Sequence, residues 1–349
     1  MRNGDLGEAV KRVKIEEAVG MVLGHDVTQI IPGEYKGPRF RRGHRIREED
    51  IPDFLKIGKE HIYVVDLGAG RVHEDDAALR LGRAFAGEHI DLSGPSEGKV
   101  TFQSKIPGLL KINLSLLHRI NRSRNVILST LHQYTPCSPG TAAGATRIIS
   151  LTAPEKQIER VEQWCRKEGP VLRILPYRKL EIGVLVTGSE FVKGRTEDRF
   201  DERVGEKIRC FGSRVVKKKV VSDDVHQIAQ ALLDLRNENM DLLLVTGGLS
   251  VDPDDVTRAG IVKAGTRVIF YGTPVLPGAM FLYGILGEKP VLGLPACVFH
   301  HNATLFDILF PRILAGEEPK RREIALLGHG GFCRNCVPCR FPVCPFGKG

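Results

Sequence analysis

The sequence lacks a long hydrophobic run. Its most apolar stretches, such as Asp241–Val245 and Val291–Leu294, are far shorter than the roughly 20 residues that a bilayer-spanning helix needs. Residues 1–5 lack the apolar core of a secretory signal peptide. Low-complexity tracts and internal repeats are also absent from the sequence. We therefore expect a cytoplasmic location and no membrane partner.

Length and net charge indicate how many domains and what kinds of partner to expect. A chain of 349 residues has room for two or three domains of roughly 100–200 residues each. The formal net charge of +9 favours anionic partners, such as phosphates or nucleotides, although an unremarkable basic surface accounts for it equally well. Arg39, Arg41 and Arg42 are not accompanied by a recognition helix or an RNA-binding signature, so we expect no nucleic-acid partner.

The pattern of predicted elements divides the chain into four segments. Residues 1–70 read as a small α+β unit, and residues 71–178 as a β-rich, mixed linker domain. Residues 179–318 read as an α/β domain, and residues 319–349 as a cysteine-rich tail.

Strands and helices alternate in the third segment. Expected strands are Glu181–Thr187, Arg214–Val221, Asp241–Thr246, Arg267–Tyr271 and Pro290–Leu294. Expected helices are Asp198–Phe211, Asp223–Asn237, Pro253–Ala264, Val298–Ala315 and a short turn or helix over Pro277–Leu286. Such alternation predicts a three-layer α/β fold with a mainly parallel sheet covered on both faces.

Glycine-rich or proline-rich turns follow four of these elements. They are Thr187-Gly188-Ser189-Glu190, Thr246-Gly247-Gly248-Leu249-Ser250, Thr273-Pro274 leading to Pro277-Gly278, and Gly293-Leu294-Pro295. In an open α/β sheet, ligands bind beyond the carboxyl ends of the strands. A Gly-Gly-x-Ser turn offers backbone N–H groups and a hydroxyl to an anion. One such turn is no more than a tight connection, but four on one edge favour a ligand site.

The order of these motifs resembles the molybdopterin-binding domain that molybdopterin adenylyltransferases, molybdopterin molybdotransferases and gephyrin share. The resemblance covers about Leu180 to Gly316, and residues before it resemble the molybdotransferase branch more weakly. It implies molybdopterin or molybdenum cofactor as the ligand. The implied pterin-binding residues are Thr187, Gly188, Ser189, Gly247, Gly248, Leu249, Ser250, Asp254, Pro277, Gly278 and Pro295.

The same resemblance implies a catalytic set of three acids, Asp198, Asp224 and Asp255, linked to Mg²⁺ or nucleotide handling. For Asp224, a charge at a helix N-terminus is an equally good account. This sequence also departs from the family's turns. The departures are Arg199-Phe200, Asp252-Pro253, Ala279-Met280 in place of a lysine, and Ala296-Cys297 in place of Gly-Asn. A lost lysine removes a cation that pairs with phosphate. These departures fall on the reacting side of the site and not on the phosphate turn, so binding is better supported than catalysis.

The departures introduce side chains with chemistry of their own. Phe200 and Phe299 are candidates for stacking on a planar ligand. Cys297 follows a strand and precedes a helix, where a thiol can be acidified and can touch the cofactor, although a buried small side chain is the commoner case. Of the adjacent His300 and His301, at most one is expected to face the ligand.

A second group of candidate site residues, four cysteines, lies in the tail. Cys333, Cys336, Cys339 and Cys344 sit within twelve positions, on what reads as a flexible, glycine-flanked segment. The spacing is close to that of bacterial ferredoxins and favours an iron–sulfur cluster, with zinc as the alternative. A tail without metal, used for docking through Arg334 and Arg340, is the third possibility.

These observations lead to one hypothesis and two alternatives. The first is a molybdopterin or molybdenum-cofactor binding protein that acts in cofactor biosynthesis, maturation or delivery to a molybdenum or tungsten enzyme. The second is an active, Mg²⁺-dependent molybdotransferase. The third is a non-catalytic scaffold or regulator with this fold. The resemblance also implies a homo-oligomer.

Overall fold

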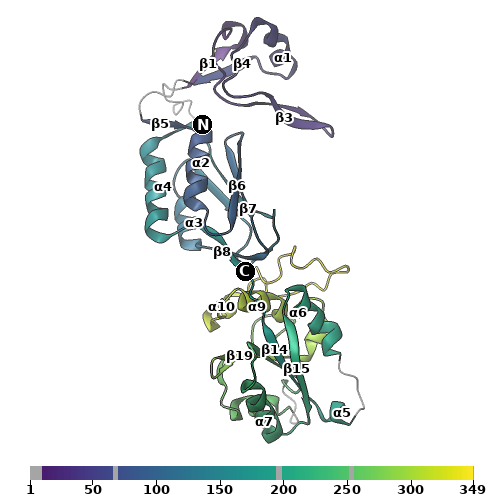
Figure 1. The fold of residues 1–349 in the computed structure, drawn as a ribbon. Coiled ribbons are helices and arrows are strands. Elements are labelled where there is room, and N and C mark those ends of the chain that lie inside the picture. Colours follow the sequence, from purple (N-terminus) through teal and green to yellow (C-terminus); the bar gives the residue numbers. More distant parts are fainter. Residues whose placement is uncertain (1–9, 66–69, 194–198, 251–254, 349) are drawn as a thin grey trace. The chain divides into compact units, whose positions relative to one another are not determined.

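The computed structural model describes residues 10–65, 70–193, 199–250 and 255–348 (Figure 1). The chain divides into two compact units. The first comprises Met1–Ile106, Lys111–Leu131 and Ser138–Ile174, and the second comprises Pro107–Leu110, His132–Cys137 and Leu175–Gly349. The expected α/β segment and the cysteine tail therefore belong to one unit. Two of the predicted site residues, Asp198 and Asp254, lie outside the described residues.

The first part of unit one is small and built around a few apolar side chains. Its elements are β1 (Val10–Lys14), η1 (Ile15–Glu17), β2 (Val27–Ile31), β3 (Tyr35–Phe40), η2 (Glu48–Asp50), α1 (Ile51–Lys56) and β4 (His61–Val65). The rings of Phe40 and Phe54 stack with their centroids 4.0 Å apart. Ile15, Leu23 and Ile46 are buried in the same core.

The second part of unit one is an antiparallel sheet with helices. Its elements are β5 (Arg71–His73), α2 (Glu74–Phe85), β6 (Ile90–Ser96), β7 (Lys99–Ser104), α3 (Leu114–Asn121), β9 (Val126–Thr130), β11 (Ala142–Ile148), β12 (Thr152–Pro154), α4 (Glu155–Glu168) and the start of β13 (Leu172–Pro176). Four strands pair in the order β6-β7-β11-β9. Helix α2 buries Ala77, Ala78, Leu81 and Phe85, which repeat at helical spacing, so one face of the helix is apolar.

Unit two contains a six-stranded sheet in the order β15-β14-β16-β19-β18-β17. Its elements are the start of β8 (Gly108–Ile112), β10 (Pro136–Cys137), β14 (Glu181–Thr187), α5 (Ser189–Val192), η3 (Asp201–Gly205), α6 (Glu206–Cys210), β15 (Arg214–Val221), α7 (Val225–Arg236), β16 (Leu242–Thr246), α8 (Thr257–Lys263), β17 (Arg267–Tyr271), β18 (Leu282–Leu286), β19 (Lys289–Leu294), η4 (Ala296–Phe299), α9 (Leu305–Leu314) and α10 (Arg321–Leu326). Strands β15, β14, β16 and β19 are parallel, whereas β18 and β17 run antiparallel to their neighbours.

Helices cover both faces of this sheet, as Figure 1 shows for α6 and α7. Alternation along β14 explains the two layers, because successive side chains of a strand point to opposite faces. Val184 and Val186 join a core with α6 and α9, whereas Leu185 joins a second core with α7 and α8. The α/β architecture expected from the sequence is thus present, with an antiparallel edge added to the parallel strands.

The expected helix over Pro277–Leu286 is wrong, because this stretch contains strand β18. Its side chains are buried on both faces, so the sequence shows no alternation that would have marked a strand. A two-residue turn, Gly287-Glu288, then reverses the chain into β19, with Leu286 paired to Lys289. Gly287 has a φ of +65°, as hairpin turns of this length require.

The helix expected over Val298–Ala315 is interrupted. A 3-10 turn, η4, is followed by a break, and α9 begins only at Leu305. Thr304 causes the new start, because its side chain accepts from the N–H of Phe306 while its own N–H donates to Asp307 Oδ2 at 2.7 Å. This reciprocal capping satisfies backbone donors that would otherwise lack partners.

The tail is packed onto unit two rather than flexible, which corrects the expectation from its glycines. Phe346 is 3% exposed and belongs to the core that contains α9. Gly347 donates its N–H to Gly330 O at 3.0 Å. A Cβ at Gly347 would come within 2.4 Å of Ile308, so the chain lies directly against that helix.

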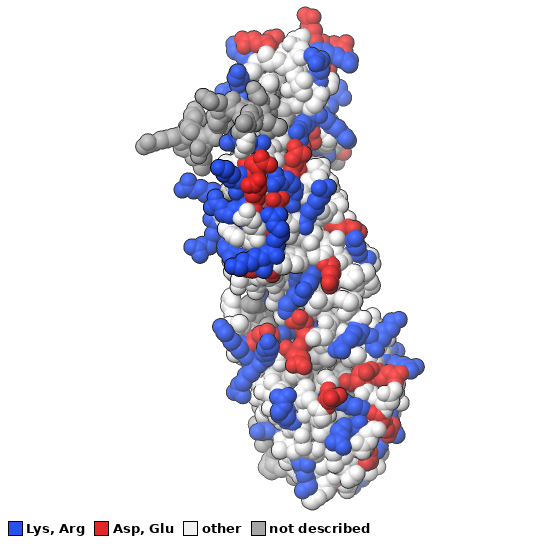
Figure 2. Space-filling model, turned by 60° about the vertical axis from the view of Figure 1, so that its left-hand side comes forward, with Lys and Arg blue, Asp and Glu red and all other residues white. Residues whose placement is uncertain are grey.

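Charged side chains are mixed on the surface. On the face that Figure 2 shows, lysine and arginine side chains are interspersed with acidic ones. Along β15, Lys217 pairs with Glu238, and Lys219 Nζ lies 2.8 Å from Asp234 Oδ2. No helix within the described part of the chain is long and apolar enough to cross a membrane.

Candidate functional site

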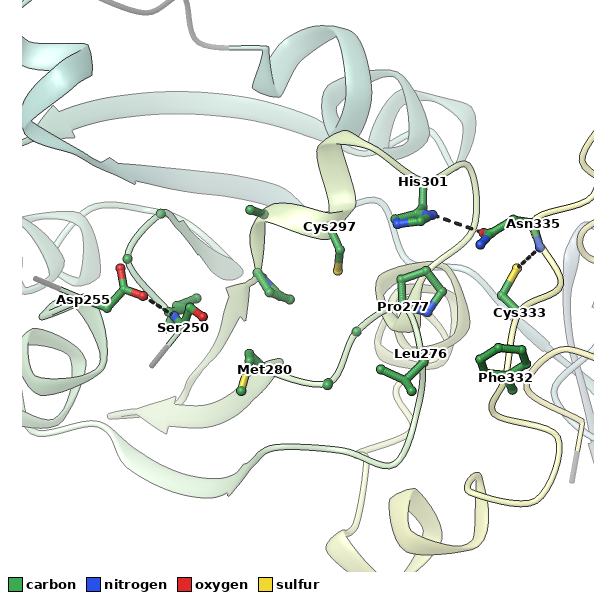
Figure 3. A pocket seen from close by; sticks show the side chains of 17 residues that line it. Ser250, Asp255, Leu276, Pro277, Met280, Cys297, His301, Phe332, Cys333 and Asn335 are labelled. Atoms are coloured by element: carbon green, nitrogen blue, oxygen red, sulfur yellow. Dashed lines mark hydrogen bonds between the residues drawn. The ribbon is translucent and has the colours of Figure 1, made fainter. Parts of the chain in front are cut away.

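Eight of the residues predicted to bind the pterin or to act in catalysis line one pocket of unit two, which has a volume of about 620 Å³. They are Gly247, Gly248, Leu249, Ser250, Asp255, Pro277, Gly278 and Pro295. In Figure 3, Ser250 and Asp255 lie on one side of the pocket, and Leu276 and Pro277 lie toward the other. The turns after β16 and β19 and the segment before β18 therefore meet, as the rule for strand ends predicts.

The reversed strand β18 explains why the segment before it joins the site. Leu282 opens β18 and pairs with Gly293 near the carboxyl end of β19. An antiparallel strand brings its amino end to the edge where its parallel neighbours end. Pro277 to Met280 consequently stand beside the turn after β16, and their position depends on the strand that sequence reasoning missed.

Gly247 and Gly248 are required by packing as well as by any ligand. Gly247 has a φ of +97°, and a Cβ there would lie 2.1 Å from the carbonyl oxygen of Thr187. Gly248 has a φ of +47°, and a Cβ there would lie 2.7 Å from Thr257 Oγ1. Both positions are left-handed and crowded, so any side chain strains the turn itself.

Asp255 closes the turn that contains these glycines. Its Oδ2 accepts a hydrogen bond from the backbone N–H of Ser250 at 2.8 Å. Leu249, between the glycines and Ser250, is 3% exposed, and its carbonyl accepts from the Tyr271 hydroxyl at 2.9 Å. The turn is therefore held by two side chains, Asp255 just before α8 and Tyr271 on β17.

The turn after β14 supports the pocket without lining it. Thr187 is 1% exposed, and its hydroxyl lies 2.7 Å from the hydroxyl of Thr257. The N–H of Ser189 donates to Asp223 Oδ2 at 2.7 Å. Thr187, Gly188 and Ser189 are thus near neighbours of the Gly247 turn but are absent from the described wall of the pocket.

Asp224 serves as the N-cap of α7. Its Oδ1 accepts from the N–H groups of His226 and Gln227, at 3.0 and 2.8 Å. This is the structural role weighed for Asp224 from the sequence, and the residue does not line the pocket. Of the three predicted acids, the described pocket contains Asp255 alone.

Cys297 and His301 line the pocket, and Figure 3 shows the Cys297 side chain pointing into it. Burial raises the pKa of the Cys297 thiol, which favours the commoner case of an inert, partly buried side chain over an acidified thiol. His301, and not His300, faces the site, and its Nδ1 lies 3.1 Å from Asn335 Oδ1. Phe200 is fully buried in the core and cannot stack on a ligand in this pocket.

Sequence reasoning missed the contribution of the tail to this pocket. Phe332, Cys333 and Asn335 form part of its wall. They are held by backbone pairing, because Cys333 N–H donates to Leu276 O and Leu276 N–H donates to Gly331 O, both at 2.8 Å. No local pattern signals this pairing, since it joins segments more than fifty positions apart in the sequence.

The tail also frames a second cavity of about 490 Å³, lined by Cys333, Cys336, Cys339 and Cys344. Phe332 and Cys333 line both cavities. Within the described residues, no group of three or more histidine, cysteine or acidic side chains is arranged to hold a metal ion. The four thiols thus share a cavity without converging on one point.

Comparison with known protein families assigns the domain that carries the pocket. Residues 183–315 match the family model described as "Probable molybdopterin binding domain". A molybdopterin molybdenumtransferase of Haemophilus influenzae is 30% identical over 269 residues, which are 68% of this chain and 64% of that protein. Residues 183–315 therefore carry a domain of this family. The resemblance found in the motifs is thereby confirmed.

The chain is also similar to proteins with other names. A CinA-like protein of Citrifermentans bemidjiense is 33% identical over 90 residues, which are 26% of this chain and 22% of that protein. The molybdopterin biosynthesis moea protein from Pyrococcus horikosii is a solved structure with 17% identity and a TM-score of 0.33, covering 88% of this chain and 75% of that one. Residues 12–66 match a domain of unknown function (DUF8806). The chain spans less than two thirds of the length of the Haemophilus and Citrifermentans relatives.

Proposed function

We propose that the protein binds molybdopterin or molybdenum cofactor and acts in the biosynthesis, maturation or delivery of that cofactor to a molybdenum or tungsten enzyme. The observation that carries the proposal is the convergence of Gly247, Gly248 and Ser250 with Pro277 and Pro295 on one pocket. The family match over residues 183–315 and the name of the Haemophilus relative support a pterin as the ligand.

The chemistry of the pocket supports binding more than catalysis. Backbone N–H groups at the glycine turn suit a phosphate. The opposite wall carries Ala279 and Met280 where the family has a lysine, and no lysine is among the described residues that line the pocket. Cys297 and Met280 supply soft, polarisable atoms beside a sulfur-rich ligand.

Opposite charges placed at Ala279 test the proposal. Ala279→Lys adds a cation to the pocket wall and should strengthen pterin binding, whereas Ala279→Glu should weaken it. Both variants place a long side chain at the same point, so they control for bulk. Pterin bound to each purified protein is measured by fluorescence after oxidation. No pterin in the wild type, with no binding of added cofactor, rules the proposal out.

A second candidate function is Mg²⁺-dependent insertion of molybdate, which the name of the Haemophilus relative suggests. Mg²⁺ commonly takes one or two carboxylates together with waters and ligand phosphates. Asp255 fits that role from within the pocket, whereas Asp224 is committed to capping α7. Bound Mg²⁺ would neutralise phosphate charge, and Asp255 would hold it beside the glycine turn.

Complementation separates this candidate from simple binding. An active molybdotransferase restores molybdoenzyme activity in a strain that lacks its own. Asp198→Ala and Asp255→Ala should each abolish that rescue, and full rescue by both variants argues against the assigned acids. A scaffold or regulator without a ligand predicts no rescue and no difference between Ala279→Lys and Ala279→Glu.

We also propose that the four tail cysteines hold a metal, as an iron–sulfur cluster or as zinc, and that the protein is a homo-oligomer. The clustered thiols support the first point. The second rests on family resemblance and is tested by light scattering coupled to size-exclusion chromatography, where a monomer mass contradicts it.

A further inference from the structure

The cavity framed by the tail has the composition of a soft-metal site. All four tail cysteines line this cavity. Cys336 and Cys339 are exposed, whereas Cys333 and Cys344 are half-buried. Arg334 and Arg340 line the same cavity. Their guanidinium groups would offset the negative charge of a centre bound by thiolates.

The segment that carries the cysteines is anchored at both ends. At its start, Phe332 pairs with Leu276, and at its end Phe346 is buried in the core. Between the anchors Phe341 and Cys344 pack against the core, whereas the side chains of Val337 and Val343 are 97% and 85% exposed. The fold has therefore already closed this loop, which lowers the entropic cost of bringing its thiols together.

One anchor is also a wall of the pterin pocket. Phe332 and Cys333 line both cavities, and Cys333 N–H donates to Leu276 O, a residue on the rim of the pocket. Asn335, two residues further on, contacts His301 in the pocket. A ligand that fixes Cys333 in the second cavity thus fixes part of the first.

We propose that Cys333, Cys336, Cys339 and Cys344 bind one soft-metal centre in the second cavity, and that its occupancy orders the shared wall of the pterin pocket. For zinc, the thiol S–H bonds break, four metal–sulfur bonds form, and four protons leave to solvent without any change of oxidation state. Because the thiols do not converge in the described structure, the exposed part of the loop must draw inward while its anchors stay in place.

Zinc alone tests the site on the full, reduced chain. We expect about one Zn²⁺ per chain by elemental analysis after dialysis, as for a site with four cysteine ligands. The double variant Cys336→Ser/Cys339→Ser, at two exposed positions, should lose it. Cys210→Ser, which removes an exposed cysteine outside the tail, should retain it. A wild type without zinc, or a double variant that keeps it, overturns the site.

Hydrogen exchange tests the coupling. Zinc should slow exchange of the Leu276 and Cys333 amides by at least about fivefold, the lower end of typical coupling between sites. Zinc binding without that protection overturns the coupling and leaves the metal site standing. Reconstitution with iron and sulfide without oxygen distinguishes a cluster, which absorbs visible light, from a zinc-only site.

These measurements use no pterin, so they are independent of the function proposed for the pocket. If the double variant loses zinc yet retains pterin, both proposals stand. If zinc binds with protection but no pterin is found, the metal site stands and the pterin assignment fails.

Discussion

The backbone N–H of Ser250 donates to Asp255 Oδ2 at 2.8 Å, inside the turn that is expected to hold an anion. One of the amides available to a phosphate is therefore already bonded to a carboxylate. The Asp255 carboxylate repels an anionic ligand at this turn unless a cation lies between them or the carboxyl group is protonated. This pair makes Asp255 the residue whose charge most directly tests what the pocket binds.

Asp255→Asn should keep the turn, because the amide oxygen can still accept from Ser250. Without Mg²⁺, removal of the charge should strengthen binding of an anionic pterin about fivefold, equivalent to roughly 1 kcal/mol for charges near 4 Å apart in a water-like environment. Binding is measured by equilibrium dialysis with fluorescence detection. The matched control is Asp241→Asn, since Asp241 Oδ2 also accepts a backbone N–H, from Glu181, at the other end of the sheet. An unchanged affinity in Asp255→Asn contradicts the prediction.

Gly247→Ala should destabilise unit two through a clash with a backbone carbonyl. Gly265→Ala is the control, since Gly265 has a similar φ of +89° but nothing within 4 Å of a Cβ. Gly265→Ala should lower the free energy of unfolding by about 1–2 kcal/mol, because of the left-handed conformation alone. Gly247→Ala should cost about 2 kcal/mol more, as overpacking typically does. The free energies are compared by chemical unfolding followed by circular dichroism, and equal losses would show that the turn has room.

Cys297 should react slowly with iodoacetamide near neutral pH. Burial raises the pKa of its thiol, and only the thiolate attacks, so its rate should rise as the pH increases. The exposed Cys210 is the internal reference in the same chain. Bound pterin should protect Cys297 and leave Cys210 unchanged. Peptide mass spectrometry measures both sites, and faster labelling of Cys297 than of Cys210 would refute the prediction.

Glu74 should make unit one less stable as the pH rises. Its side chain is buried, and burial raises the pKa of the carboxyl from 4.5 to about 7. Because the unfolded chain ionises near 4.5, the contribution of Glu74 is complete below that pH and is lost as the pH rises to about 7. The loss is about 3 kcal/mol at roughly 1.4 kcal/mol per pKa unit.

Glu74→Gln should remove this loss, so the difference in stability between variant and wild type grows between about pH 4.5 and 7. Trp164, the single tryptophan, lies on α4 in unit one and reports its unfolding in urea. Glu159→Gln, at an exposed position on the same helix, is the control and should show no such trend. A constant difference for Glu74→Gln would mean that its carboxyl is ionised in the folded state.

Much of the α/β unit follows from local patterns. Strands β14 and β16 are buried apolar runs that end in glycine turns, and α7 is amphipathic with an acid at its N-cap. Strand β18 could not be separated from a helix by its apolar residues, although the two-residue Gly287-Glu288 turn was a usable hairpin signal. The break before α9 was encoded in Thr304 and Asp307, which together form a capping box.

The site was predictable where it follows a strand end and not where it depends on distant pairing. Gly247 to Ser250 and Pro295 lie where the strand-end rule puts them. Cys333 and Asn335 reach the pocket only because the tail pairs with Leu276, and no periodicity or motif encodes that contact. The role of Asp224 was ambiguous in the sequence because an N-cap and a ligand use the same residue type.

The Gly287-Glu288 turn stands at the end of the sheet opposite the pocket, yet it fixes which residue of β18 faces which residue of β19. One residue more or less in that turn would slide β18 by about 3.3 Å and invert its faces. Pro277 to Met280 would move with it, away from the turn after β16. The size of ligand that such a pocket admits is thus open to change by insertions or deletions far from the pocket, and homologues that differ in this hairpin are the place to seek different ligands.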